Sequence, residues 1–330
     1  MPNKLVAGIC VAAAAAAAVM CAVSTAARAQ DFPSRPIRMI VPFPPGGVMD
    51  VTTRAVAAPL QENLGQSIVI ENRAGGGGNI GTEAVARSAP DGYTLLVIGD
   101  HTTIAPALYS HLSYDFVRDF VPITNLVTGS HVLVAHSSLA VNNVQQLIAE
   151  AKKHPGQLSY ASPGSGTAQH LGAEMLKTMA GGLEITHIPY KGGGQAITDV
   201  VAGQVKLGML GLAPALPHIK SGKLKALGVT GTKRVAVLPD VPTIAESGLP
   251  GFVTLQWYGV AAPAGTPQPV IRKLYAELVK ALQHPATVER LTAVGMEVAP
   301  SASPAEYAAF IREDMAKWPA VVKSAGARVD

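Results

Sequence analysis

Three glycine-rich loops, at residues 41–47, 161–167 and 189–194, are the part of this 330-residue chain best suited to chemistry. Each follows a stretch typical of a strand and precedes a helical pattern. Glycine lets the backbone approach a ligand closely, and the first N–H groups of a helix lack partners within that helix. Because the helix dipole adds attraction for negative charge, each loop predicts a site for phosphate or carboxylate, unless its glycines only turn the chain.

The candidate ligand-binding residues lie in or near such loops. They are Phe43, Pro44, Gly46, Gly47, Asp50, Thr102, Thr103, Ser162, Gly164, Ser165, Gly166, Thr167, His170, Tyr190, Lys191, Gly192 and Leu210. Asp50 could contact the ligand or only cap a helix, and His170 could serve the ligand or the structure. Lys191 could pair with a second carboxylate or stay solvated. No arginine lies in the three loops, so backbone groups are expected to neutralise the charge.

A fourth glycine run suggests a nucleotide-binding protein as one alternative. Gly76, Gly78 and Gly81 match the dinucleotide spacing, and Asp100 ends the following strand where a ribose-binding acid would sit. Against this, residues 75–78 are uninterrupted glycine, which is more typical of a flexible turn, and an exported protein seldom meets free dinucleotide.

An exported hydrolase is the other alternative, with Ser165 as nucleophile. Ser165 lacks the flanking glycine spacing of a nucleophile elbow, and with nine histidines a trio with His170 and Asp199 is expected by chance. No two histidines are four residues apart, and both cysteines, Cys10 and Cys21, precede residue 30. We therefore expect no enzyme activity, metal or cofactor.

The first residues have the pattern of a secretory signal peptide. Lys4 precedes an apolar run over residues 5–23, and the triplet Ala27-Arg28-Ala29 is a suitable cleavage site. A retained membrane anchor is the alternative, since the run could reach across a bilayer. Cleavage after Ala29 removes Lys4 and Arg28, so the formal charge changes from +4 to +4 − 2 = +2. This small charge gives no indication of nucleic-acid binding.

From Pro36 onward, short β-branched runs alternate with helical patterns, which is typical of α/β proteins with largely parallel sheets. About 300 mature residues exceed one ordinary core, so we expect two lobes. The expected strands cover 38–43, 67–71, 94–98, 158–161, 185–190, 205–210 and 224–230, and the expected helices cover 48–64, 80–87, 144–153, 168–179 and 195–202. Thr266 is expected to cap one terminal helix and Ser303 with Glu306 to form a capping box on another, both packing on the first lobe.

The order of short motifs along the mature chain resembles that of the tripartite tricarboxylate transporter substrate-binding proteins, also called Bug receptors. The motifs are Arg35-Pro36-Ile37, Val41-Pro42-Phe43, Glu71-Asn72-Arg73, Pro90-Asp91-Gly92-Tyr93, Tyr160-Ala161-Ser162, Pro189-Tyr190-Lys191-Gly192, Leu238-Pro239-Asp240, Trp257-Tyr258-Gly259 and Ala262-Pro263-Ala264-Gly265-Thr266-Pro267. Each motif is weak alone, but their order is specific.

This resemblance implies a type II periplasmic binding protein fold, with two α/β lobes around a ligand cleft and two crossover segments between them. We place the signal peptide at 1–29, lobe 1 at 30–127 and 252–330, and lobe 2 at 128–251. The resemblance implies that the loops at 43–50 and 162–167 hold a carboxylate. It also implies a periplasmic monomer that delivers its ligand to inner-membrane tripartite transporter subunits.

One position departs from the pattern of the family. Relatives often carry an aspartate near the position of Leu210, where this chain is apolar. An apolar distal end would disfavour an ammonium group, so we expect an aromatic or aliphatic acid rather than an amino acid. Trp257 and Tyr258 are expected to pack in the core or hinge rather than against a ligand.

Overall fold

The computed structural model describes residues 32–327, so the predicted signal peptide lies outside the described residues. The strands are β1 (Ile37–Val41), β2 (Ile68–Asn72), β3 (Thr94–Gly99), β4 (Phe120–His136), β5 (Leu158–Ser162), β6 (Ile185–Pro189), β7 (Leu207–Gly211), β8 (Leu224–Val229), β9 (Leu255–Pro263) and β10 (Glu297–Val298). The helices are α2 (Val48–Leu64), the 3-10 turn η1 (Gly76–Gly78), α3 (Asn79–Ala86), α4 (Asp100–Leu108), α5 (Phe116–Asp119), α6 (Val144–Lys153), α7 (Ala168–Met179), α8 (Gly193–Val201), α9 (Leu212–Lys220), α10 (Gln268–Leu282), α11 (Pro285–Ala293) and α12 (Pro304–Ala325). None of the helices in this range has the length and apolar character needed to span a bilayer.

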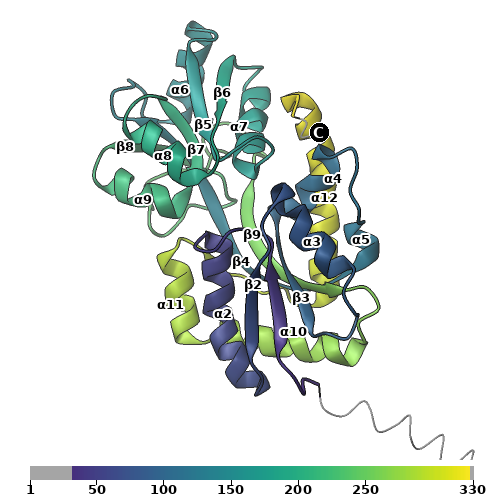
Figure 1. Cartoon of the computed structure of the whole chain (residues 1–330). Helices are drawn as coiled ribbons and strands as arrows, with labels where there is room; N and C mark the ends of the chain where they lie inside the picture. Colours follow the sequence, from purple (N-terminus) through teal and green to yellow (C-terminus); the bar gives the residue numbers. More distant parts are fainter. Residues whose placement is uncertain (1–31, 328–330) are drawn as a thin grey trace, which may run out of the picture.

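The chain folds into two α/β lobes (Figure 1). The first lobe has the strand order β2-β1-β3-β9-β4, and the second continues as β4-β7-β5-β6, with β8 also paired to β4. Successive residues of β1 point to opposite faces: Met39 packs with the core under α2 and α10, while Ile40 packs with the core under α3 and α12. Both faces of the first sheet are therefore covered, as the apolar strands predict.

The two lobes are joined where β4 changes its pairing partner. β4 pairs with β9 as far as Ser130 opposite Leu255, and from His131 it pairs with β7. The chain returns to the first lobe next to this point of β4. The N–H of Thr230 bonds to the carbonyl of His131 at 3.1 Å, and the N–H of Thr254 bonds to the carbonyl of Thr230 at 3.0 Å. The expected boundary at residue 128 therefore falls inside a continuous strand.

Local sequence signals place several helices where they are expected. The helix at 48–64 is confirmed as α2, and Gly65 ends it in the left-handed conformation with φ of 65°. The helices at 144–153 and 168–179 are also confirmed, capped by the side chains of Asn143 and Thr167.

Two predicted caps differ from the structure. Pro267 rather than Thr266 precedes α10, because the Thr266 hydroxyl donates to the Pro263 carbonyl at 2.7 Å. Ser303 does cap α12, but the Glu306 carboxylate accepts from the N–H of Ala302 instead of completing the capping box. Helices α10 and α11 pack on the first lobe as expected, whereas α12 also contacts α7 of the second lobe.

Candidate functional site

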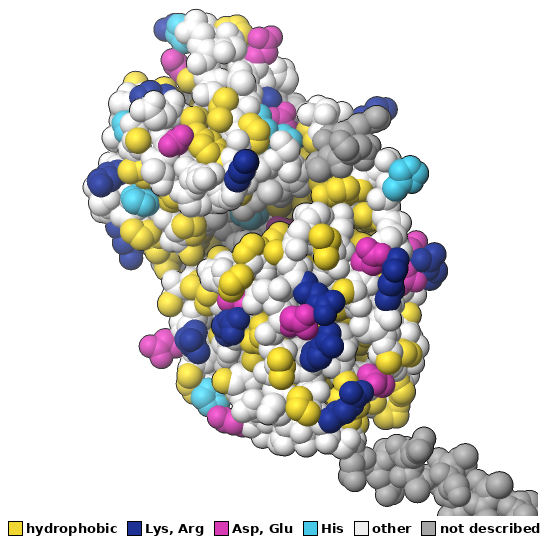
Figure 2. Space-filling view, viewed as in Figure 1, with side chains coloured by type: hydrophobic (Ala, Val, Ile, Leu, Met, Phe, Trp, Pro, Cys, Tyr) yellow, Lys and Arg dark blue, Asp and Glu magenta, His cyan; other side chains and the backbone are white. Residues whose placement is uncertain are grey.

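A cavity of about 460 Å³ lies between the two lobes, where the molecular surface is hollowed (Figure 2). The starts of four helices reach it, namely α2, α4, α7 and α8. The lining residues are Phe43, Pro44, Pro45, Gly47, Val48, Met49, Gly77, Asp100, His101, Ile104, Ala105, Leu108, Tyr109, Pro163, Ser165, Gly166, Thr167, Ala168, Gln169, Gly192, Gly193, Gln256 and Tyr258. The three predicted glycine-rich loops therefore converge on one cavity.

Asp50 organises the first of these loops without lining the cavity. Its carboxylate accepts from the Gly46 N–H at 3.0 Å, from Arg54 Nε at 2.9 Å and from Asn72 Nδ2 at 3.0 Å. Burial alone raises the pKa of Asp50, but these three donors outweigh burial and hold that pKa below its usual value. Asp50 is therefore an ionised structural support that shapes the loop after β1.

The second loop is supported from behind by two histidines. His170 Nδ1 accepts from the Gly166 N–H at 3.0 Å, and Ser162 Oγ lies 2.6 Å from His187 Nε2. The two rings stack with centroids 4.0 Å apart. Burial lowers the pKa of both histidines, to about 4 for His187. Neutral imidazoles thus hold residues 162–167 in the shape that faces the cavity.

Seven of the predicted site residues line the cavity: Phe43, Pro44, Gly47, Ser165, Gly166, Thr167 and Gly192. Gly46, Asp50, Ser162, Gly164 and His170 belong to the supporting shell of the same loops. Thr102 and Thr103 are buried and do not line the cavity: Thr102 Oγ1 lies 3.2 Å from His101 Nε2, and Thr103 Oγ1 donates to Asp314 Oδ2 at 2.5 Å.

The remaining three predicted residues lie away from the cavity. Tyr190 donates to Asp199 at 2.7 Å, and Lys191 is exposed. Leu210 is 1% exposed and packs in the core of the second lobe with Val132 and Val134. Since β7 directs Leu210 into that core, this residue does not form the expected apolar distal end of the cavity.

The cavity also holds polar residues that the loop patterns did not indicate. Asp100 and His101 open α4 with no preceding glycine-rich loop, and Gln256 and Tyr258 come from β9. From the sequence alone, Asp100 is expected only as a possible ribose-binding acid. The usable signal was its place at the carboxyl end of β3, the edge at which α/β sheets bind ligands.

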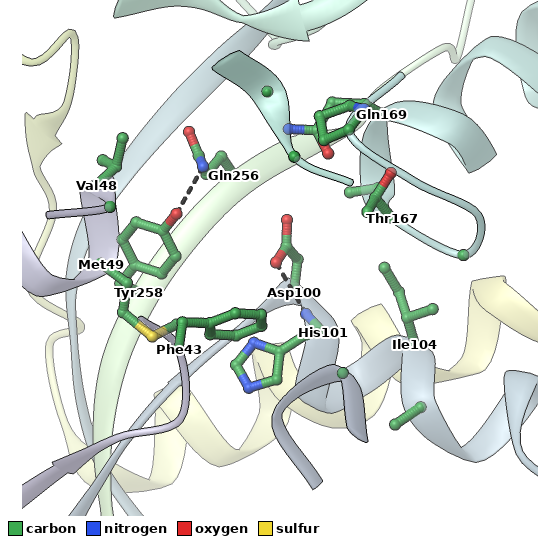
Figure 3. A pocket seen from close by; sticks show the side chains of 18 of the residues that line it. Phe43, Val48, Met49, Asp100, His101, Ile104, Thr167, Gln169, Gln256 and Tyr258 are labelled. Atoms are coloured by element: carbon green, nitrogen blue, oxygen red, sulfur yellow. Dashed lines mark hydrogen bonds between the residues drawn. The ribbon is translucent and has the colours of Figure 1, made fainter. Parts of the chain in front are cut away.

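Asp100 dominates the electrostatics of the cavity. Its Oδ1 accepts from the His101 N–H at 2.8 Å (Figure 3). Burial, with a smaller contribution from the charge of Asp314, raises the pKa of Asp100 to about 7 against the opposing effects of that N–H and of Lys317. Burial also lowers the pKa of the neighbouring His101 to about 3. Close to neutral pH, the cavity therefore contains a neutral imidazole and a carboxyl poised to titrate.

No lysine or arginine between residues 32 and 327 lines the cavity. The Gly47 and Gly192 positions that precede α2 and α8 provide no side-chain cap, so the first N–H groups of these helices remain available. In the same range, no three histidine, cysteine or acidic side chains are grouped as metal ligands. The site therefore offers backbone dipoles and apolar surface to an anion.

Comparisons with known proteins agree with this geometry. Residues 52–327 match the model of the tripartite tricarboxylate transporter family receptor. Protein BugT of Bordetella pertussis is 40% identical over 303 residues, covering 91% of this chain and 92% of its own. An R. palustris protein solved with adipate is 36% identical, with a TM-score of 0.80 over 91% of this chain and 100% of its own. MatC from Rhodopseudomonas palustris, with bound malate, is 34% identical, with a TM-score of 0.76 over 88% of this chain and 100% of its own.

Proposed function

Because the chain belongs to the tripartite tricarboxylate transporter receptor family, which includes the Bug proteins, we propose that it captures a small organic carboxylate between its lobes. The observation that carries the proposal is the approach of uncapped helix starts, α2 from one lobe and α8 from the other, to one cation-free cavity. A carboxylate held by both starts would draw the lobes together. Relatives solved with adipate and malate support this ligand class.

In this proposal the closed, loaded protein delivers its ligand to tripartite transporter subunits in the inner membrane. The family consists of periplasmic binding proteins, so residues 1–29 act as a signal peptide that is removed after Ala29. In this proposal one moving lobe holds residues 32–130 with 255–327, and the other holds residues 131–254, since β4 changes its pairing partner after Ser130. The mature receptor acts as a monomer, with one ligand per chain.

The protein carries out no reaction in this account. The closest serine–histidine pair in the second lobe joins Ser162 and His187, but Ser162 is 0% exposed and so is inaccessible to a substrate. Ser165 does line the cavity, where its loop position suits binding of the ligand. The family match favours neither a hydrolase nor a nucleotide-binding protein.

A thermal-shift screen of the mature protein tests the proposal. A carboxylate at 100 times its Kd should stabilise the folded state by about 2.7 kcal/mol, whereas the matching alcohols should have no effect. NAD and a model ester are the comparison ligands for the two alternatives. Stabilisation by NAD, or turnover of the ester, without a response to any carboxylate would contradict the proposed function.

A further inference from the structure

Asp100 is an acid inside a cavity that otherwise suits an anion. Its Oδ1 is bonded to the N–H of His101, while its Oδ2 makes no hydrogen bond to any residue between 32 and 327. Figure 3 shows the side chain rising from α4 toward the space between Gln256 and Thr167. One carboxyl oxygen of the protein is therefore left to a partner that occupies the cavity.

The start of α4 differs from the other helix starts around the cavity. At α2, the first-turn acid Asp50 is turned away from the cavity and is satisfied by Gly46, Arg54 and Asn72. At α8 the first turn contains no acid. At α4, by contrast, Asp100 faces the cavity and already uses the attraction of the helix start. A second anionic group placed there would be repelled by the ionised Asp100.

The protein groups around Asp100 do not donate a hydrogen bond to its Oδ2 in the described chain. Asp314 on α12 is engaged by Thr103, Trp318 and Lys317, so the nearby cation is already paired. On β9, the Tyr258 hydroxyl accepts a hydrogen bond from Gln256 Nε2 at 2.6 Å, and no hydrogen bond joins it to Asp100 in the described chain. The rest of the nearby wall is largely apolar. A carboxylate oxygen that faces the cavity without a protein donor favours a bound donor over an apolar group.

We propose that Asp100 makes this site selective for carboxylates that carry a hydrogen-bond donor, a hydroxyl or an ammonium group, on the part of the ligand that faces α4. The anionic end lies at the starts of α2 and α8, and Asp100 Oδ2 accepts from the donor at the other side of the cavity. This inference rests on the proposed function and reverses the expectation drawn from Leu210, since the acid in the cavity comes from the start of α4 and not from β7.

The test uses ligand triplets that differ only in the donor. Each triplet contains a parent acid and its forms with a hydroxyl or an amino group at the end remote from the carboxylate: butyrate, 4-hydroxybutyrate and 4-aminobutyrate; pentanoate, 5-hydroxypentanoate and 5-aminopentanoate; hexanoate, 6-hydroxyhexanoate and 6-aminohexanoate. Calorimetry on the mature protein measures every Kd at pH 8. The Asp100→Asn variant keeps an acceptor but no charge, and Asp100→Ala removes both. Asp91→Asn, on the exposed Arg35–Asp91 pair, is the control.

We expect the wild type to bind a donor-bearing member about 10-fold or more tighter than its parent. Asp100→Asn should abolish a preference for ammonium and keep part of a preference for hydroxyl, whereas Asp100→Ala should abolish both. The Asp91 variant should behave as wild type. If carboxylates bind but the preference is absent or survives in Asp100→Ala, the inference is wrong and the proposed function stands. If no carboxylate binds the wild type, both are wrong.

Discussion

The ring of His170 accepts a hydrogen bond from the N–H of Gly166 at 3.0 Å, which fixes one wall of the cavity from behind. The side chain is 5% exposed and does not line the cavity itself. Its contribution to binding must therefore act through the position of the loop.

Replacing this acceptor should weaken binding without removing any contact to the ligand. For His170→Ala we expect a loss of about 1 kcal/mol in carboxylate affinity, because the unpaired Gly166 N–H lets the loop relax. The change should appear mainly as a faster dissociation rate in stopped-flow fluorescence. Tyr190→Phe, which loses a hydrogen bond to Asp199 away from the cavity, is the control. Equal losses of carboxylate affinity in His170→Ala and Tyr190→Phe would argue against a specific role for His170.

The N–H at the start of α8 can be removed by a single substitution. Gly193 is the first residue of α8, a position at which proline is tolerated, and no atom lies closer than 4.0 Å to the site of an added Cβ. Gly193→Pro should therefore weaken carboxylate binding by about 1.5–3 kcal/mol, the value of one charge-assisted hydrogen bond. Gly193→Ala retains the N–H and should bind as wild type in calorimetry. A Gly193→Pro variant with unchanged affinity would show that this N–H does not hold the ligand.

Ligand preference should depend on pH through Asp100. Its pKa is raised to about 7, so the carboxyl is mostly neutral at pH 6 and mostly ionised at pH 8. An ammonium-bearing ligand should therefore bind about tenfold more tightly at pH 8 than at pH 6. Its unsubstituted parent should bind less tightly as the pH rises, because the ionised Asp100 repels an added anion. Both changes of affinity with pH should vanish in Asp100→Asn. If either persists in that variant, another group is responsible for the pH dependence.

Acid should destabilise the fold well above the pH at which carboxylates titrate. Burial lowers the pKa of His131 from 6.5 to about 4, and neither ring nitrogen of this residue has a hydrogen-bond partner in the described chain. Since the unfolded chain takes up the proton first, the stability gained from a neutral His131 is complete above about pH 6.5 and is lost as the pH falls toward 4. For this one residue the loss is at most about 3 kcal/mol. Urea unfolding at several pH values gives the free energy of unfolding. Below about pH 6.5 this free energy should fall less steeply with decreasing pH in His131→Phe than in a variant of the exposed His111.

The helices could be predicted from sequence better than the crossover strands. The bounds of α6 and α7 follow from local signals, since Asn143 and Thr167 cap their starts. Strand β4 was not predicted because Pro122 and Gly129 interrupt its pattern. The pairing that stabilises this strand comes from residues more than 120 positions later, in β9. Such non-local pairing leaves no periodic trace in a short window.

The candidate site was predicted where glycine marks it and missed elsewhere. Three of the four helix starts follow glycine-rich loops, and all three reach the cavity. The fourth, at Asp100, follows only Gly99, and Pro106 within α4 obscures the helical pattern. The wall from β9 could not be inferred, because Tyr258 reaches the cavity only through the position of that strand between the lobes.

A crystal structure of the mature protein with its tightest-binding carboxylate tests the central claim most directly. We expect the ligand carboxylate within hydrogen-bond distance, about 3 Å, of N–H groups at the starts of α2 and α8, with a donor group of the ligand against Asp100 Oδ2. A carboxylate bound by a lysine or arginine side chain, or a ligand held by one lobe alone, would contradict the account.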